Sequence, residues 1–210
     1  RSNRWDEPGD GVDHEAAGFT LMKAGDGWVS VVRAAEGGGA PGAAQLTFLT
    51  RSVDTAAAHL RDEGFHVREW DTPHGLHAAV TNPAGQEVWI TQVQPELVGY
   101  QAHDDPVTTP LVVVGVLYSP DFARDSEFFA HFGLEPVGKA SEHWSALDGR
   151  RGRVGLHASG EGMEQPRGGP CAADLGFETS EPLGDVVHRL HQAGFDDARL
   201  VQDEHVSAIH

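Results

Sequence analysis

The chain has 210 residues, of which 39% are hydrophobic, enough for one large domain or two small ones and too many for a disordered protein. Its formal net charge of -17 repels phosphate backbones and anionic lipids, so nucleic acids and membranes are not expected as partners. The longest apolar run, Leu111 to Tyr118, is far shorter than the roughly 20 residues of a membrane-spanning helix. With one cysteine, Cys171, and no basic-then-apolar leader, we expect a soluble, cytoplasmic protein.

The first half of the chain predicts a strand, a helix and three more strands. Gln45–Thr50 alternates apolar and polar residues, as a half-buried strand does. Ser52 is a helix cap, apolar residues then recur at three- and four-residue spacing, and Gly64 ends the helix. The three strands are expected over His66–Trp70, Leu76–Thr81 and Glu87–Val93.

The second half repeats this order twice. A strand from Leu111, a helix over Asp121–Phe132 and strands around His143–Leu147 and Arg153–Ala158 come first. A strand over Ala172–Thr179, a helix capped by Ser180 and two more strands close the sequence.

An internal repeat relates the two halves. Phe19 matches Trp144 and Gly27 matches Gly152, both 125 residues later, and the segment LRDEGF from Leu60 matches LHQAGF 130 residues later. We therefore predict two domains, over 1–101 and 110–210, joined by a polar linker over 102–109. The comparison of the halves also leads us to expect that the opening strand and helix of the first domain and the closing strand of the second are missing.

These segments resemble one protein superfamily. Four strand-helix-strand units, with the segments PHGLHAAVTNPAGQEVWI from Pro73 and QLTFLTRSVDTAAAHL from Gln45, resemble the vicinal oxygen chelate (VOC) superfamily of glyoxalases, extradiol dioxygenases and bleomycin-resistance proteins. The resemblance covers nearly the whole chain. It implies an α+β fold in which tandem βαβββ units form two half-barrel domains, each with a concave face for a ligand. The halves pair within one chain or across a homodimer, and the sequence leaves both open.

The resemblance also indicates where a metal site would lie. Enzymes of the superfamily hold a divalent metal ion with about three His, Glu or Gln side chains on the first and last strands of their units. Those places fall here on Gln45, Trp89, Val114 and Asp174, with His157 beside another. Since Trp89 and Val114 cannot bind a metal, no complete site is visible. Gln45 is a possible but weak oxygen ligand, and at most the second domain combines His157 and Asp174 with a third ligand from elsewhere.

Tryptophans on the predicted strands suggest a different role. Trp28, Trp70, Trp89 and Trp144 are expected on strands that line the sheets, where aromatic side chains bind flat or apolar ligands. Core packing is the alternative for each of them. The ligand-binding candidates are Trp28, Gln45, Trp89, Trp144, His157 and Asp174.

Two functional hypotheses follow. The first is a metal-free binding protein without a cofactor, which sequesters an aromatic or cationic small molecule in a Trp-lined cavity, as bleomycin-resistance proteins do with their antibiotics. The second is a divalent-metal-dependent lyase, isomerase or ring-cleaving dioxygenase with its site in the second domain. The excess of acidic residues favours a cationic or neutral ligand, although acidic surfaces also serve solubility alone.

Overall fold

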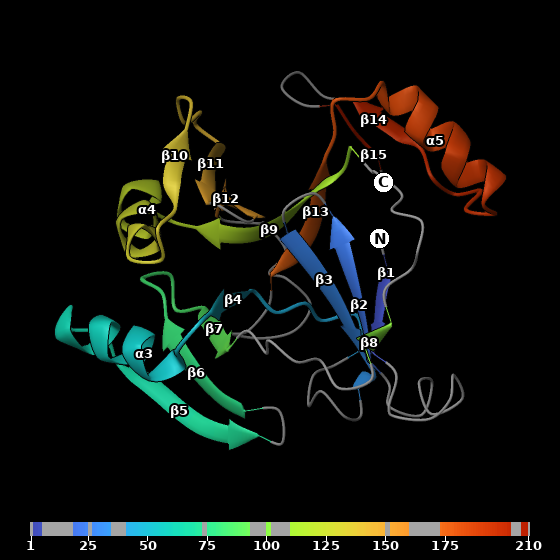
Figure 1. Ribbon diagram of the computed structural model, residues 1–210. Coiled ribbons are helices and arrows are strands. Elements are labelled where there is room, and N and C mark those ends of the chain that lie inside the picture. Colours follow the sequence, from blue (N-terminus) through green and yellow to red (C-terminus); the bar gives the residue numbers. More distant parts are fainter. Residues whose placement is uncertain are drawn as a thin grey trace.

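The protein combines mixed β-sheets with α-helices, which confirms the predicted α+β class (Figure 1). No helix in the described part of the chain has the length and apolar character that a membrane span requires. The predicted linker over 102–109 lies outside the described residues, as does Cys171. The structure, a computed structural model, describes residues 2–5, 19–24, 27–34, 41–72, 75–92, 100–101, 110–149, 152–159, 173–202 and 207–209.

The segment from Thr47 to Gln92 forms a four-stranded sheet with one helix. Its strands lie in the order β4-β7-β6-β5, with β4 parallel to β7 and the other neighbours antiparallel. The observed strand and helix bounds agree closely with those expected from the sequence. They are β4 (Thr47–Thr50), α3 (Val53–Asp62), β5 (Val67–Thr72), β6 (Gly75–Thr81) and β7 (Glu87–Gln92).

The next segment has the same element order and the same strand pairing. In the sheet β10-β11-β12-β9-β13, β9 is parallel to β12, and β13 is added antiparallel to β9 at the edge. Short strand β10 was not predicted. The bounds are β9 (Val112–Ser119), α4 (Phe122–Ala130), β10 (Glu135–Val137), β11 (Trp144–Gly149), β12 (Gly152–Ala158) and β13 (Asp174–Glu178).

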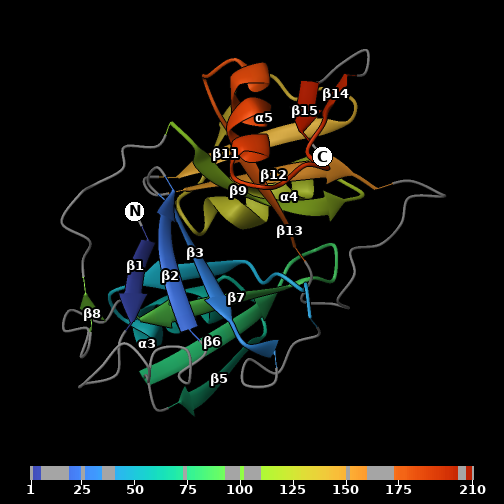
Figure 2. The ribbon, with the colours of Figure 1, turned by 90° about the vertical axis from the view of Figure 1, so that its right-hand side faces the viewer.

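The remaining elements come from the two ends of the chain and from residues 100–101 near its middle. One sheet has the order β3-β2-β1-β8, and a helix with a strand pair follows β13. Figures 1 and 2 show the sheet β3-β2-β1-β8 on the side of β7 and β6 that faces away from α3. The bounds are β1 (Ser2–Trp5), β2 (Phe19–Ala24), β3 (Gly27–Val32), β8 (Tyr100–Gln101), α5 (Leu183–Gln192), β14 (Leu200–Gln202) and β15 (Ser207–Ile209).

Several elements recur at the spacing of the sequence repeat. Strands β2 and β3 begin at residues 19 and 27, and β11 and β12 begin at 144 and 152, each 125 residues later. Helix α3 begins at 53 and α5 at 183, which is 130 residues later. The tandem arrangement of two half-barrel domains and their boundaries at 101 and 110 remain predictions.

Equivalent positions of the repeat also contact one another. A Cβ atom on Gly152 would lie 3.7 Å from the Cα of Gly27, and one on Gly27 would lie 2.2 Å from a methyl carbon of Val113. A side chain at position 27 would therefore collide with β9. Ala44 and Ala173, which lie 129 residues apart, form an antiparallel bridge. The Ala173 amide donates to the Ala44 carbonyl at 3.0 Å.

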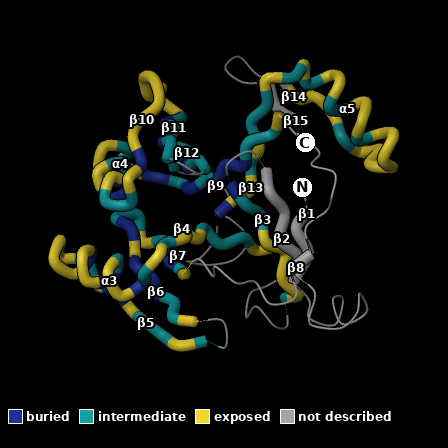
Figure 3. Tube along the Cα trace, in the orientation of Figure 1, coloured by how far each residue is buried: buried dark blue, intermediate teal, exposed yellow. Residues whose placement is uncertain are grey.

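One apolar core joins the two units that flank the predicted linker. It combines Val53 and Leu60 of α3 with Phe128 and Phe129 of α4, all at most 2% exposed, together with residues of both sheets (Figure 3). Phe65 packs edge-on against Phe128, with ring centroids 5.2 Å apart. Residues on both sides of the predicted domain boundary thus share one hydrophobic interior.

A buried carboxyl group lies where these units meet. Asp125 of α4 is 1% exposed and accepts a hydrogen bond from the Ser119 hydroxyl at 2.5 Å. Burial raises the pKa of Asp125, and the Ser119 hydroxyl and the backbone amide of Ala84 partly oppose this rise. Ala84 belongs to the Asn82–Gly85 turn between β6 and β7, so α4 contacts the turn of the other unit.

Side chains cap two of the three helices in the described part of the chain. The Ser52 hydroxyl accepts a hydrogen bond from the Thr55 amide at 3.2 Å at the start of α3, as predicted. Asp121 does the same for α4, where its carboxylate accepts from the amides of Ala123 and Arg124.

The predicted Ser180 cap of the third helix is wrong. Helix α5 begins at Leu183, its N-cap is Pro182, and no side chain caps it. The Pro182 carbonyl accepts hydrogen bonds from the amides of Asp185 and Val186. The helix starts here because proline fixes its own φ near helical values and restricts the residue before it, which leaves Ser180 outside the first turn.

The capping difference can be measured directly. Ser52→Ala should lower the free energy of unfolding by about 1 kcal/mol, because an amide in the first turn of α3 loses its acceptor. Ser180→Ala is the matched control, and we expect a change within about 0.5 kcal/mol. Urea unfolding of both variants checks this, and equal losses would contradict the assignment of the caps.

Stability should also depend on the ionisation of Asp125. The folded protein holds this proton more tightly than the unfolded chain, so the stabilisation is largest at acid pH and is lost as pH rises through the raised pKa. Asp125→Asn cannot ionise and keeps an oxygen for the Ser119 hydroxyl. Relative to the unmodified protein, the variant should gain free energy of unfolding in urea titrations as pH rises from about 4, the ordinary pKa of an Asp carboxyl group, through the raised pKa of Asp125. A difference that is constant with pH would contradict this.

Candidate functional site

The first candidate site is the face of the sheet β4-β7-β6-β5 that points away from α3. Val88 and Ile90 of β7 are buried in the apolar core, so the alternating residues Glu87, Trp89 and Thr91 point to the opposite side. We call this surface the β7 face and define it by the side chains that strand register places there. They are Gln45, Arg68, Trp70, His77, Glu87, Trp89 and Thr91.

Two tryptophans form the centre of the β7 face. The rings of Trp70 and Trp89 meet edge to face, with centroids 5.3 Å apart and planes inclined at 73°. The His77 ring lies 5.7 Å from Trp70, and its Nε2 lies 3.3 Å from the Thr91 hydroxyl. Trp70 and Trp89 are both half-buried, so they combine an ordered aromatic surface with access for a ligand.

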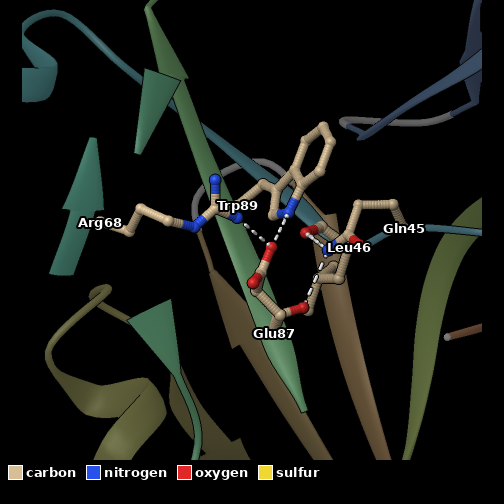
Figure 4. Close-up of polar contacts among 5 residues, drawn as sticks. All are labelled: Gln45, Leu46, Arg68, Glu87 and Trp89. Carbon is tan, nitrogen blue, oxygen red and sulfur yellow. Dashed lines mark hydrogen bonds and ion pairs between the residues drawn. The ribbon is translucent and has the colours of Figure 1, made fainter. Parts of the chain in front are cut away.

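A charged network holds Trp89 in place. Its indole N–H donates to the Glu87 carboxylate at 2.6 Å, and the Arg68 guanidinium donates to the same carboxylate oxygen at 2.9 Å (Figure 4). Arg68 also lies over the Trp70 ring, 4.3 Å from its centroid. The network orients both rings and neutralises Glu87, so this carboxylate is not available as a counter-ion for a ligand.

Gln45 contributes an acceptor beside Trp89. Its amide nitrogen donates to the carbonyls of Leu46 and Glu87, each at 2.9 Å (Figure 4). Its Oε1 is buried and has no hydrogen-bond partner among the described residues. An acceptor left in this way costs free energy, and a ligand that donates an N–H or O–H would remove that cost.

The second candidate site is the face of the sheet β10-β11-β12-β9-β13 that points away from α4. Strand register places Trp144, His157, Tyr118 and Asp174 on this surface, which we call the β12 face. The Tyr118 hydroxyl donates to Asp174 at 2.9 Å, and the Tyr118 ring lies 5.5 Å from that of His157. The Trp144 and His157 rings are 6.3 Å apart.

Tyr118 is a fixed hydrogen-bond donor on the β12 face. Its partial burial raises its pKa, and its hydrogen bond to the Asp174 carboxylate raises it further. The phenol therefore keeps its proton at neutral pH. It contacts both candidate metal ligands of the second domain, His157 and Asp174.

Trp144 is held over a glycine on the next strand. A Cβ atom on Gly155 would lie 2.0 Å from the Trp144 ring, so the indole needs a position without a side chain. At Gly176 on β13, which β9 separates from β12, the nearest atom to an added Cβ would be 3.4 Å away. Of these two glycines, only Gly155 provides space that a tryptophan ring occupies.

The potential metal ligands on the β12 face do not form a three-ligand site. The Nδ1 of His157 lies 3.0 Å from the Ala158 carbonyl, an orientation that directs Nε2 outward as in many metal ligands. Asp174 already accepts from Tyr118. Among the described residues, no third His, Cys, Asp or Glu completes a cluster with these two, and a catalytic ion needs about three protein ligands.

The six predicted binding residues lie on three sheets. Gln45 and Trp89 meet on the β7 face, and Trp144, His157 and Asp174 meet on the β12 face. Trp28 lies on β3, in a different sheet from either group.

The prediction missed three polar residues that organise these faces. Arg68 and Glu87 were missed although each lies two residues before a predicted tryptophan on its own strand, which is the period of one strand face. Tyr118 was missed because its neighbours come from β12 and β13, and only register reveals them.

Comparisons with known proteins do not identify the family. No family model and no curated protein matches the chain. A crystal structure of catechol 2,3-dioxygenase matches with a TM-score of 0.49 and 14% identity, over 74% of this chain and 58% of that one. A hypothetical protein from Staphylococcus aureus matches with a TM-score of 0.40 and 9% identity, over 77% of this chain and 62% of that one. The chain thus spans about three fifths of the length of these two proteins, and neither likeness carries an argument about function.

The position of Trp144 is open to a direct test. Gly155→Ala should displace the indole, change the near-ultraviolet circular dichroism and lower the free energy of unfolding by about 1–3 kcal/mol through overpacking. Gly176→Ala should leave the spectrum unchanged, because its new methyl group meets only ordinary contacts. Identical spectra for the two variants would show that Trp144 does not lie over Gly155.

Proposed function

We propose that the chain is a small-molecule-binding protein of the VOC type that holds a flat aromatic compound of cationic character on the β7 face. The observation that carries the proposal is the pair Trp70 and Trp89, ordered edge to face beside the unsatisfied acceptor of Gln45. Aromatic side chains provide a large contact area, and a small number of convergent polar groups then select the ligand.

The polar groups of the β7 face define what the ligand must offer. Because Arg68 and the Trp89 indole already occupy Glu87, the free acceptor is Oε1 of Gln45, which favours a ligand with an N–H or O–H donor. The net charge of -17 favours a cation over an anion by long-range attraction. Cationic aromatic antibiotics, which bleomycin-resistance proteins bind, are compounds of this kind.

The metal-dependent alternative has weaker support. It would use His157 and Asp174, and the described residues of the β12 face supply only these two ligands of the three that such a site needs. Binding on the β7 face requires no group beyond those the structure places there. It is therefore the better-supported function, while ring cleavage, isomerisation and lyase chemistry remain sequence-based predictions.

Dye binding tests the proposed site. Proflavine, a planar cation, should bind saturably in the presence of a chelator and quench tryptophan fluorescence. Trp89→Leu should weaken this binding about tenfold, since an aromatic contact contributes about 0.5–1.5 kcal/mol beyond buried area. Gln45→Leu should also weaken it, because the N–H donors of the dye, its ring N–H and two amino groups, lose an acceptor.

Two controls make the test specific. Trp144→Phe, on the β12 face, should leave proflavine affinity unchanged. The anion 8-anilinonaphthalene-1-sulfonate should bind more weakly than proflavine to the unmodified protein. Saturable binding that is insensitive to Trp89→Leu, or no saturable binding at all, would refute the proposal.

A further inference from the structure

Three side chains with metal-binding chemistry meet between α3 and α4, apart from both sheet faces. His59, Glu63 and His131 each offer one ligand atom, and these atoms lie within 4.8 Å of one another. In the described ranges, no other group of three His, Cys, Asp or Glu side chains has this spacing.

Local structure explains why the three side chains converge. His59 and Glu63 are four residues apart at the end of α3, so they lie on the same side of the helix. His131 is the C-cap of α4, and its ring lies 6.0 Å from that of His59. Phe65 packs edge-on against His131 at 5.2 Å and fixes the position of the imidazole.

The electrostatic setting favours a cation. Helices α3 and α4 both end at this point, and the unsatisfied carbonyls of a helix C-terminus carry partial negative charge. The nearest arginine of α3, Arg61, is directed to Glu69 and to the Val67 carbonyl and does not neutralise Glu63. None of the three side chains forms a hydrogen bond or ion pair with another described residue.

We propose that His59, Glu63 and His131 bind one divalent transition-metal ion, with Zn²⁺ as the best match. Two imidazoles and a carboxylate suit Zn²⁺, whereas Mg²⁺ and Ca²⁺ require oxygen ligands. Tetrahedral bonds of about 2.1 Å place ligand atoms about 3.4 Å apart, a distance that small rotations of the exposed side chains of His59 and Glu63 would reach. Water would complete the coordination.

Such an ion would act as a structural clamp. His59 and Glu63 belong to the unit before the predicted linker, and His131 belongs to the unit after it. An ion bound only by the folded protein stabilises it in proportion to the logarithm of its concentration. The site is independent of the β7 face, so its test and the proflavine test succeed or fail separately.

Calorimetric titration of the full chain with zinc chloride tests the site. Chelator-treated protein should bind Zn²⁺ and show a higher melting temperature with it, and magnesium chloride should do neither. Glu63→Gln, an exposed substitution that leaves the core intact, should weaken Zn²⁺ binding at least about tenfold. The double variant His59→Ala/His131→Ala should lose one equivalent of bound Zn²⁺ and the rise in melting temperature.

The matched control is His66→Ala, an exposed histidine on the same unit that lies outside the group. It should bind Zn²⁺ like the unmodified protein, which shows that the loss is not a general effect of removing histidine. Zn²⁺ binding that Glu63→Gln and the double variant leave unchanged would overturn the proposal, as would the absence of Zn²⁺ binding by the unmodified protein.

Discussion

The apolar core that α3, α4 and both sheets share is the interaction on which the rest of the structure depends. Each helix covers one face of its own sheet, Phe128 and Phe129 of α4 are buried in this core, and Phe65, just beyond the end of α3, packs edge-on against Phe128. Because the core occupies this side of both sheets, the opposite sides are left to polar and aromatic residues. Burial of the apolar side chains in this core therefore determines which residues form the β7 face and the β12 face.

The same core gives the chain its unusual polar features. Asp125 is buried because the turn of one unit closes over α4 of the other, and this closure raises its pKa. At the far end of the same helix pair, His59 and His131 come together because α3 and α4 both end there. Packing of α4 by its apolar side thus determines the surroundings of Asp125 near its start and of His131 at its end.

Local patterns in the sequence predicted local structure well. The alternation in Gln45–Thr50, the Ser52 cap and the 125-residue spacing of the hairpins all correspond to observed elements. The sites were harder to predict, because Glu87, Arg68 and Trp89 meet only through the register of three strands. His59 and His131 meet only through packing of two helices, which no local pattern records. Ser180 shows the opposite error, a favourable local signal that a nearby proline overrode.

The contact between Gly27 and Gly152 has different consequences for the two residues. The predicted repeat makes them equivalents, and the structure brings their backbones within ordinary contact distance of each other. At position 27 a Cβ atom would lie 2.2 Å from a methyl carbon of Val113, so a neighbouring side chain excludes a substitution. At position 152 the nearest atom to a new Cβ would be 3.7 Å away, and glycine is favoured instead by the positive φ of 117°. Equivalent glycines are thus retained for different reasons, one for space and one for backbone conformation.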